Sequence, residues 1–244
     1  MYFKPAMLVS ALFLSSFSAH AELSSYNQNG VELVYSSVSD VTWTKDANLF
    51  KTMYDADNSL ISKIAAATTS YNDSYFGYRT LDKRDFNTTY GIASWWGGQA
   101  FVGYLNSISY GGSNQWYLPT VVNNVSGINL PTNGTVTGDE FAELFYQELG
   151  GIGWNSIPDT AIFDNENSWV FGFWSGTEHE VATYRAWGFD SRSGFQNSNR
   201  NKDFQRYIWA VTPGQVTTVP EASTYAMLLA GLTALGLAIR RYRA

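Results

Sequence analysis

The sequence predicts an α+β domain in which two helices pack beside a twisted antiparallel sheet. Short β segments open the body of the chain, stretches in its middle carry apolar residues at helical spacing, and β segments return near its end. The last of these segments is apolar on both faces, which is typical of a central strand. Together these patterns predict the α+β class.

The first β segments are expected at residues 31–35, where apolar and polar residues alternate, and at 40–43, which end in an aromatic anchor. Residues 46–49 and 55–58 are rich in carboxylates and amides and are expected to cap or turn the chain. A calcium loop is the alternative, since hard cations take clustered oxygens. The segment lacks the glycine and the downstream glutamate of an EF-hand loop. Asn58–Thr68 is expected to form a short helix.

Two further helices carry clearer apolar stripes. Gly91–Ile108 has one such stripe and precedes the pair Gly111 and Gly112. In the second, Thr137 followed by Glu140 is a capping-box pattern, and apolar residues of 141–149 form the buried face. Three carboxylates lie in its first turns: Asp139, Glu140 and Glu143. An interaction with the helix dipole is expected for them, with paired acid/base catalysis as the alternative.

The rest of the body is expected to be β-rich. Residues 116–120 predict an aromatic strand broken by proline, and 121–136 predict a loop. Further strands are expected at 169–174, 183–189 and 206–211, with residues 190–194 turning the chain back into Phe195 and Gln196. In the last strand two apolar sets alternate: Tyr207, Trp209 and Val211 point one way, Ile208 and Ala210 the other.

The amino terminus has the features of an export signal. Lys4 provides a positive charge, Met7–Phe17 is a short apolar run, and Ala19 and Ala21 form a small-x-small pattern. Signal peptidase reads this pattern, so cleavage is expected after Ala21. The predicted organisation is a signal peptide at 1–21, a domain at 22–213, a linker at 214–219 and a tail at 220–244.

The tail has three parts: the triplet Pro220, Glu221 and Ala222, an apolar run at 225–239, and the arginines Arg240, Arg241 and Arg243. A helix over 222–239 would be about 27 Å long at ~1.5 Å per residue, just adequate for a ~30 Å hydrocarbon core. The arginines are expected to stay on the cytoplasmic side, which leaves the domain outside.

This order of parts resembles the PEP-CTERM sorting signal of Gram-negative bacteria. The resemblance implies that the tail holds the protein in the inner membrane until an exosortase cuts near the triplet, after which the protein reaches the cell surface or extracellular matrix. An ordinary membrane anchor is the alternative.

Charge and cysteine content exclude several functions. Cleavage at both ends removes Lys4 and three arginines, so 15 − 4 = 11 bases face 21 acids and the formal net charge goes from −6 to −10. Nucleic-acid binding is therefore not expected, because it needs a cationic surface. The absence of cysteine excludes thiol nucleophiles, thiolate zinc sites and iron–sulfur clusters. No metal or cofactor is expected.

Short motifs spread over the body resemble the C-type-lectin-like Lcl C-terminal domain of exported bacterial proteins. The motifs are residues 41–43 with 46–49, 116–120, 173–177, and 186–189 before the closing strand 207–211. The resemblance implies a compact α+β fold with two helices beside a twisted antiparallel sheet. Tyr117 replaces the arginine usual in the family, and Trp209 stands where many relatives have a cysteine. The calcium-dependent sugar motifs of C-type lectins are absent.

No catalytic residue is expected. His179 lies between Glu178 and Glu180, but neighbouring residues of an extended chain point to opposite sides, so a solvated turn is expected there rather than a metal ligand or a base. The chain has no Gly-x-Ser-x-Gly elbow, no His-Glu-x-x-His helix and no phosphate-binding glycine loop. These observations favour a protein that is not an enzyme.

Aromatic residues favour a binding function. The chain has 9 tryptophans, 16 tyrosines and 15 phenylalanines, and aromatic faces beside amides suit sugar rings and their hydroxyls. The expected binding residues are Tyr184, Arg185, Trp187, Asp190, Arg192, Gln196, Asn197, Asn199 and Arg200. Core packing of the aromatic residues and solvation of the polar loop are the alternative. The expected function is binding of exopolysaccharide; a purely structural matrix protein and a divergent glycan hydrolase are the alternatives.

Overall fold

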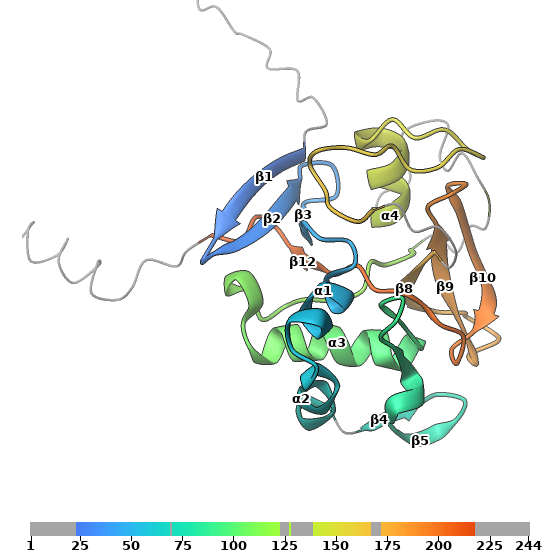
Figure 1. Ribbon diagram of the computed structural model, residues 1–244. Coiled ribbons are helices and arrows are strands. Elements are labelled where there is room, and N and C mark those ends of the chain that lie inside the picture. The colour runs from blue at the N-terminus through green and yellow to red at the C-terminus, as the bar shows by residue number, and fades with distance from the viewer. Residues whose placement is uncertain (1–22, 69, 123–126, 128–138, 167–171, 218–244) are drawn as a thin grey trace, which may run out of the picture.

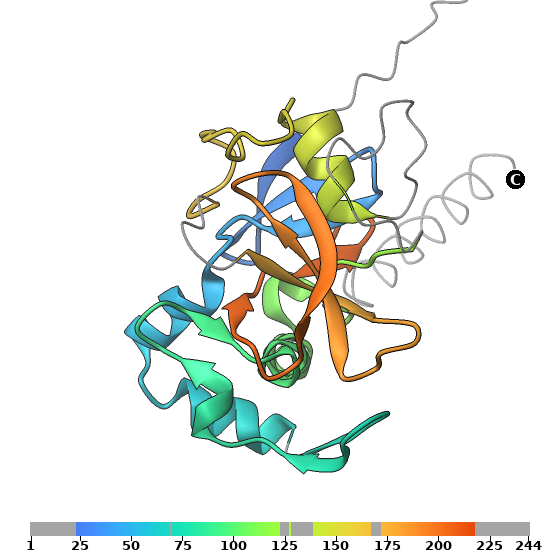
Figure 2. The ribbon, with the colours of Figure 1, turned by 90° about the vertical axis from the view of Figure 1, so that its right-hand side faces the viewer.

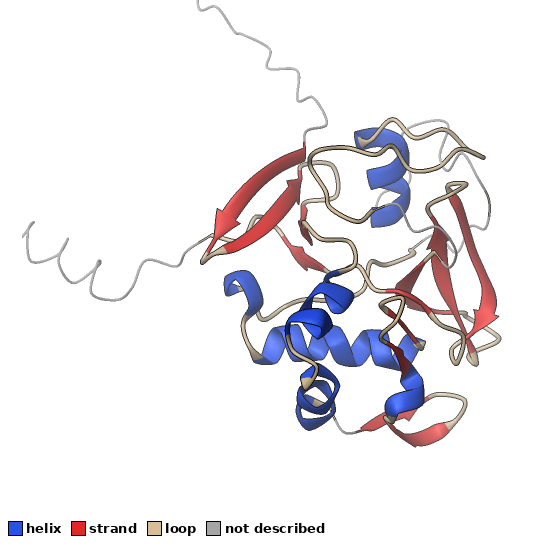
Figure 3. Cartoon of the chain, in the orientation of Figure 1, coloured by secondary structure: helices blue, strands red, loops and turns tan. Residues whose placement is uncertain are grey.

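The computed structural model describes residues 23–68, 70–122, 127, 139–166 and 172–217 (Figure 1). These residues form a mixed α+β structure with two larger sheets, a two-stranded hairpin and four α-helices (Figure 3). The predicted α+β class is confirmed. The predicted signal peptide at 1–21 and the predicted helix at 222–239 lie outside the described residues. None of the helices that the structure describes is both long and apolar enough to cross a membrane.

The first sheet has four antiparallel strands in the order β1-β2-β3-β12. Its strands are β1 (Leu23–Gln28), β2 (Val31–Ser36), β3 (Val41–Thr44) and β12 (Val211–Pro213). The predicted strands at 31–35 and 40–43 are thus confirmed, whereas β1 was not predicted. Its signal is the turn that follows: Asn29 and Gly30 both have positive φ, 53° and 81°, as two-residue hairpin turns require.

The second sheet has six strands in the order β10-β9-β8-β11-β7-β6. The strands are β6 (Phe86–Asn87), β7 (Ile92–Ala93), β8 (Phe173–Glu178), β9 (Arg185–Asp190), β10 (Phe195–Asn201) and β11 (Arg206–Tyr207). The expectation of a purely antiparallel sheet is wrong at one place, since β11 pairs with β8 in parallel. A separate hairpin is formed by β4 (Ser70–Asp73) and β5 (Gly77–Thr80).

The predicted closing strand 206–211 is divided between the two sheets, β11 belonging to one and β12 to the other. The prediction that it is apolar on both faces is confirmed, because Ile208 and Trp209 are 1% and 0% exposed. The two faces fill different cores, so the chain passes between the cores as it leaves one sheet for the other.

The helices are α1 (Leu49–Ala56), α2 (Leu60–Ala67), α3 (Trp95–Ser107) and α4 (Glu140–Ala142), the last continuing as a π-helix over Glu143–Glu148. Short 3₁₀ turns occupy Lys83–Asp85 and Tyr110–Gly112. Helices α2 and α3 confirm the expected helices at 58–68 and 91–108, whereas α1 was not predicted and covers parts of the expected loop segments 46–49 and 55–58. The carboxylates of these segments turn the chain, as expected: Asp46 accepts from the Asn48 N–H at 2.8 Å, and Asp57 from the Ser59 N–H at 2.9 Å.

Helix α4 corrects the predicted capping box. It begins at Glu140, with Asp139 as the N-cap residue, and Thr137 lies outside the described residues. The buried Glu140 carboxylate instead accepts from the N–H of Thr120 at 2.6 Å and from the Tyr117 hydroxyl at 3.0 Å. These bonds hold residues 116–120, which are not the predicted strand but form a single bridge, Tyr117 to Val211. Pro119 has no N–H to extend that pairing.

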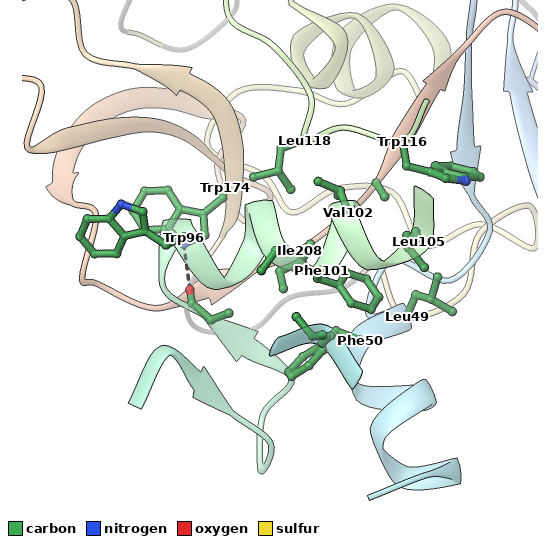
Figure 4. Packing of buried hydrophobic residues seen from close by; sticks show 14 of the residues in the cluster. Leu49, Phe50, Trp96, Phe101, Val102, Leu105, Trp116, Leu118, Trp174 and Ile208 are labelled. Carbon is green, nitrogen blue, oxygen red and sulfur yellow. Dashed lines mark hydrogen bonds between the residues drawn. The ribbon is translucent and has the colours of Figure 1, made fainter. Parts of the chain in front are cut away.

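Two hydrophobic cores hold the fold together. The first surrounds α3, which crosses the centre of the molecule in Figure 1 and packs against α1, β8 and the 116–118 segment (Figure 4). Within it the indole N–H of Trp174 donates to the Ala93 carbonyl at 2.9 Å. The second core, here called the aromatic core, lies between the sheets and α4. It includes Trp43, Phe141, Phe145, Phe163, Phe173, Phe189 and Trp209.

The carboxyl group of Glu148 makes the stability of this fold depend on pH. Burial raises its pKa from 4.5 to about 7, and the charge of Glu143 acts in the same direction. The unfolded chain therefore ionises at lower pH than the folded one, so this residue's contribution to stability is lost as pH rises from 4.5 to about 7. Glu148→Gln is expected to raise the free energy of unfolding by on the order of 2 kcal/mol at about pH 8 and by little at about pH 4. Urea unfolding at both pH values measures this; an equal effect at both would contradict it.

Candidate functional site

A groove of about 310 Å³ lies beside β10 and the turn that joins it to β9. In Figure 2 this β9–β10 hairpin, coloured orange, stands next to helix α4. Ten side chains line the groove: Trp154, Asp190, Arg192, Ser193, Phe195, Asn197, Asn199, Arg200, Phe204 and Arg206. A second hollow, about 260 Å³, lies between α2 and the turn at Lys83–Asp85 and is mainly apolar.

The predicted turn at 190–194 is confirmed and forms one wall of the groove. The Asp190 carbonyl accepts from the Gly194 N–H at 2.8 Å, and the Asp190 carboxylate accepts from the Arg192 N–H at 3.0 Å. Gly194 has a φ of 68°, which favours glycine, and its carbonyl accepts from the Tyr146 hydroxyl at 2.7 Å. The turn is therefore tied to the π-helix that follows α4.

A β-bulge places three polar side chains of β10 on the same side. The register between β10 and β9 shifts between Asn197 and Arg200. Strict alternation would send Arg200 to the side opposite Asn197 and Asn199, yet all three line the groove. A bulge inserts an extra residue and re-aims the side chains beyond it. The bulge is thus the local feature that gathers two amides and a guanidinium.

Trp154 presents an aromatic face at the rim. Trp154 is 71% exposed. Its backbone has a φ of 69°, a conformation that bulky residues rarely adopt. Its N–H donates to the Ser193 carbonyl at 2.8 Å, so the loop is held against the β9–β10 turn. Strained backbone of this kind is found at binding sites, where the surrounding structure maintains it. Phe195 and Phe204 provide two more rings in the groove.

The groove is rich in guanidinium groups. Arg192 pairs with Asp190 at 3.4 Å, and Arg200 lies 4.6 Å from the ring centre of Phe204. Arg206 is 4% exposed, and its buried Nε has no hydrogen-bond partner among the residues that the structure describes. Burial lowers the pKa of Arg206 to about 10, with the charge of Arg200 as a second cause. It remains a cation at neutral pH.

Glycines make room for the Arg206 guanidinium. A Cβ at Gly188 would lie 2.5 Å from its Nη1, and a Cβ at Gly172 would lie 3.2 Å from the same atom. Its Cζ is 5.2 Å from the Trp174 ring. The guanidinium is therefore held between backbone and an indole face, at the floor of the groove.

The structure brings five of the nine predicted binding residues into the groove. They are Asp190, Arg192, Asn197, Asn199 and Arg200. Trp187 and Gln196 are 4% and 1% exposed and face the interior, where the Gln196 amide donates to Asp139 at 3.0 Å. Tyr184 and Arg185 lie beside the β4–β5 hairpin instead, with the Tyr184 ring 5.2 Å from that of Tyr75.

Five residues that line the groove were not predicted: Ser193 and Phe195 belong to the predicted hairpin, and Trp154, Phe204 and Arg206 lie outside it. Trp154 and Phe204 lie in irregular segments on either side of it, and no periodicity marks them. Arg206 did carry a signal, because it begins a strand that is otherwise apolar on both faces. A charged residue in such a strand is expected to be buried, and charged residues are rarely buried unless they are paired, so its position indicates a specific role.

The expected turn around His179 is confirmed. Its Nδ1 accepts from the N–H groups of Val181 and Ala182, both at 3.1 Å, and Glu178 pairs with Lys202 rather than with the histidine. Among the residues that the structure describes, no group of three histidine or carboxylate side chains is placed to hold a metal ion.

Comparison with known families identifies the tail. The PEP-CTERM protein-sorting motif matches residues 218–243, a range that contains all six predicted tail residues: Pro220, Glu221, Ala222, Arg240, Arg241 and Arg243. The motif supports an exported protein that passes through a membrane and is processed by an exosortase. No curated protein and no solved structure matches the chain. The resemblance of the body to a C-type-lectin-like domain stays a prediction.

Proposed function

We propose that this exported, exosortase-processed protein is a non-enzymatic component of the cell surface or extracellular matrix that binds exopolysaccharide in the groove beside β10. In this proposal signal peptidase cuts after Ala21, the tail holds the protein briefly in the inner membrane, and the domain then acts outside. The observation that supports binding is the convergence of aromatic faces with amide and guanidinium donors in one groove.

The chemistry of the groove suits a sugar ring. Carbohydrates present apolar C–H faces and a rim of hydroxyls, so they need a flat aromatic surface beside hydrogen-bond donors and acceptors. Trp154 provides an exposed face, and Asn197 and Asn199 of β10 provide amides in the same groove. The volume of about 310 Å³ is at the lower end of the ~300–1,000 Å³ range of small-ligand sites, which suits a short segment of a polysaccharide.

A glycan hydrolase is less well supported. Glycoside hydrolysis commonly uses two carboxyl groups about 5–9 Å apart across the scissile bond. Asp190 is the one carboxylate among the described residues that line the groove, and it pairs with Arg192. The groove as described therefore offers hydrogen bonds and stacking but not a pair of acids, which favours binding over cleavage.

Binding of the exported protein to exopolysaccharide purified from its producing cells tests the proposal. Titration calorimetry should show binding, and Trp154→Ala should weaken it about tenfold, the effect of losing ~1.4 kcal/mol of stacking. Ile152→Ala is the matched control, because Ile152 is in the same loop, is 65% exposed and does not line the groove. Thermal unfolding should be unchanged in both variants. Absence of binding to any such polysaccharide would contradict the proposal and favour a purely structural protein.

A further inference from the structure

The two buried cations of the described chain, Lys202 and Arg206, differ in their ion pairs. Lys202 is 0% exposed, and its ammonium pairs with the carboxylates of Asp73 and Glu178. Arg79, whose side chain is only partly buried, also pairs with a buried carboxylate, that of Asp85, at 2.6 Å. Arg206 is 4% exposed, but no described carboxylate forms an ion pair with it. Buried charges are costly unless they are paired, so Arg206 differs from Lys202 in having no ion-pair partner among the described residues.

The surroundings of Arg206 increase this imbalance. Arg200 lies near enough to lower its pKa, and no ion pair of Arg200 occurs in the described chain. The charge of Asp190, also on the groove wall, acts in the opposite direction and raises the pKa of Arg206, but the ion pair of this carboxylate is with Arg192, which also donates its backbone N–H to it. Three guanidinium groups thus share one carboxylate among the described lining residues, in a chain whose formal net charge is −6.

Arg206 is also positioned by the fold. Gly188 of β9 and Gly172 before β8 leave the space that its guanidinium fills, and the Trp174 ring lies alongside. A side chain at either glycine would displace it. A guanidinium fixed in this way has lost its conformational freedom before any ligand arrives, so less entropy is lost when it binds an anion.

From these contacts we infer that the groove recognises an acidic sugar, and that Arg206 pairs with the anionic group of that sugar. The inference rests on the proposed function and adds the ligand class. The anionic group is a carboxylate, as in a uronic acid, or a sulfate ester; either accepts two hydrogen bonds from a guanidinium. Arg200 would add a second cation at the mouth of the groove, while Trp154 covers the ring.

Chemical modification of the polysaccharide provides the test. Exopolysaccharide from the producing cells is used in three forms: native, carboxyl-reduced so that uronic acids become neutral hexoses, and desulfated. Loss of the anionic group should weaken binding by the exported protein at least tenfold, and raising the salt concentration should weaken binding of the native form. The form that loses affinity identifies the anion.

The outcomes separate this inference from the proposed function. Equal binding of all three forms would overturn the acidic sugar and leave polysaccharide binding intact. Failure of the native form to bind would overturn both.

Variants of the protein supply a second readout. Arg206→Met should reduce binding of the native polysaccharide at least tenfold while the midpoint of thermal unfolding stays the same or rises, because a buried unpaired cation has been removed. Arg200 is exposed, so the Arg200→Gln variant should fold normally. It should lose less affinity for the native polysaccharide than Arg206→Met does. Lys63→Gln, which removes one exposed positive charge from α2, is the control and should bind like the wild type. Unchanged binding in Arg200→Gln and Arg206→Met would overturn the inference.

Discussion

Replacing Lys202 by methionine is expected to lower the free energy of unfolding by about 3–5 kcal/mol, the usual loss when one member of a buried ion pair is removed. The Lys202 ammonium is fully buried, lies 2.6 Å from the Asp73 carboxylate and also pairs with Glu178. It lies 4.6 Å from the centre of the Trp95 ring as well. Methionine fills similar volume but leaves Asp73 buried without a cation. Urea unfolding of the two proteins measures the difference.

The matched control for this change is Lys63→Met. Lys63 pairs with Asp57 at 2.5 Å, but both side chains are about half exposed, so little change in stability is expected. Burial alone would raise the pKa of Asp73, but its bonds to Lys202 and to N–H donors outweigh burial and hold the pKa at about 2. The stability from this pair is therefore lost as pH falls from 3.8 toward 2 in the wild type. Similar losses in both variants would contradict the buried pair.

Replacing Trp209 by alanine is expected to cost about 3–5 kcal/mol, as for other large-to-small changes of a buried aromatic residue. Trp209 is 0% exposed, and its ring centre lies 4.9 Å from those of Trp43 and Phe163 and 5.2 Å from that of Phe173. Its indole N–H donates to the Thr44 carbonyl at 2.8 Å. The substitution therefore opens a cavity in the aromatic core and leaves a carbonyl of β3 without its donor. Denaturant unfolding measures the loss.

Trp209→Phe separates the contribution of ring packing from that of the indole hydrogen bond. It retains a ring in the core and removes the hydrogen bond, so a loss of about 1–2 kcal/mol is expected. Trp154→Ala, which removes an indole that is 71% exposed, should leave the free energy of unfolding almost unchanged. If Trp209→Ala were as mild as Trp154→Ala, the aromatic core would not be packed as described.

Elements with strong local signals could be predicted from the sequence. Alternation in residues 31–35 marked β2, and the Asp190 to Gly194 turn carried its own hydrogen-bonding residues. Elements that depend on partners could not. Strand β1 is polar, and it exists because β2 provides a pairing edge. Helix α1 was obscured because the Asp46 carboxylate before it accepts from the Asn48 N–H in a turn, and such turns also suit a loop.

The sorting signal could be identified from the sequence alone. Sorting signals are recognised as linear segments, so their order along the chain is the information, and the motif at 218–243 needs no folded neighbour. The candidate groove was decided by tertiary structure. Trp154, Asn199 and Arg206 belong to three separate segments, and a bulge in β10 together with the glycines around Arg206 brings them together. Register and backbone space depend on neighbouring strands, so no local pattern could have placed a guanidinium that has no described counter-ion in the same groove as an exposed indole.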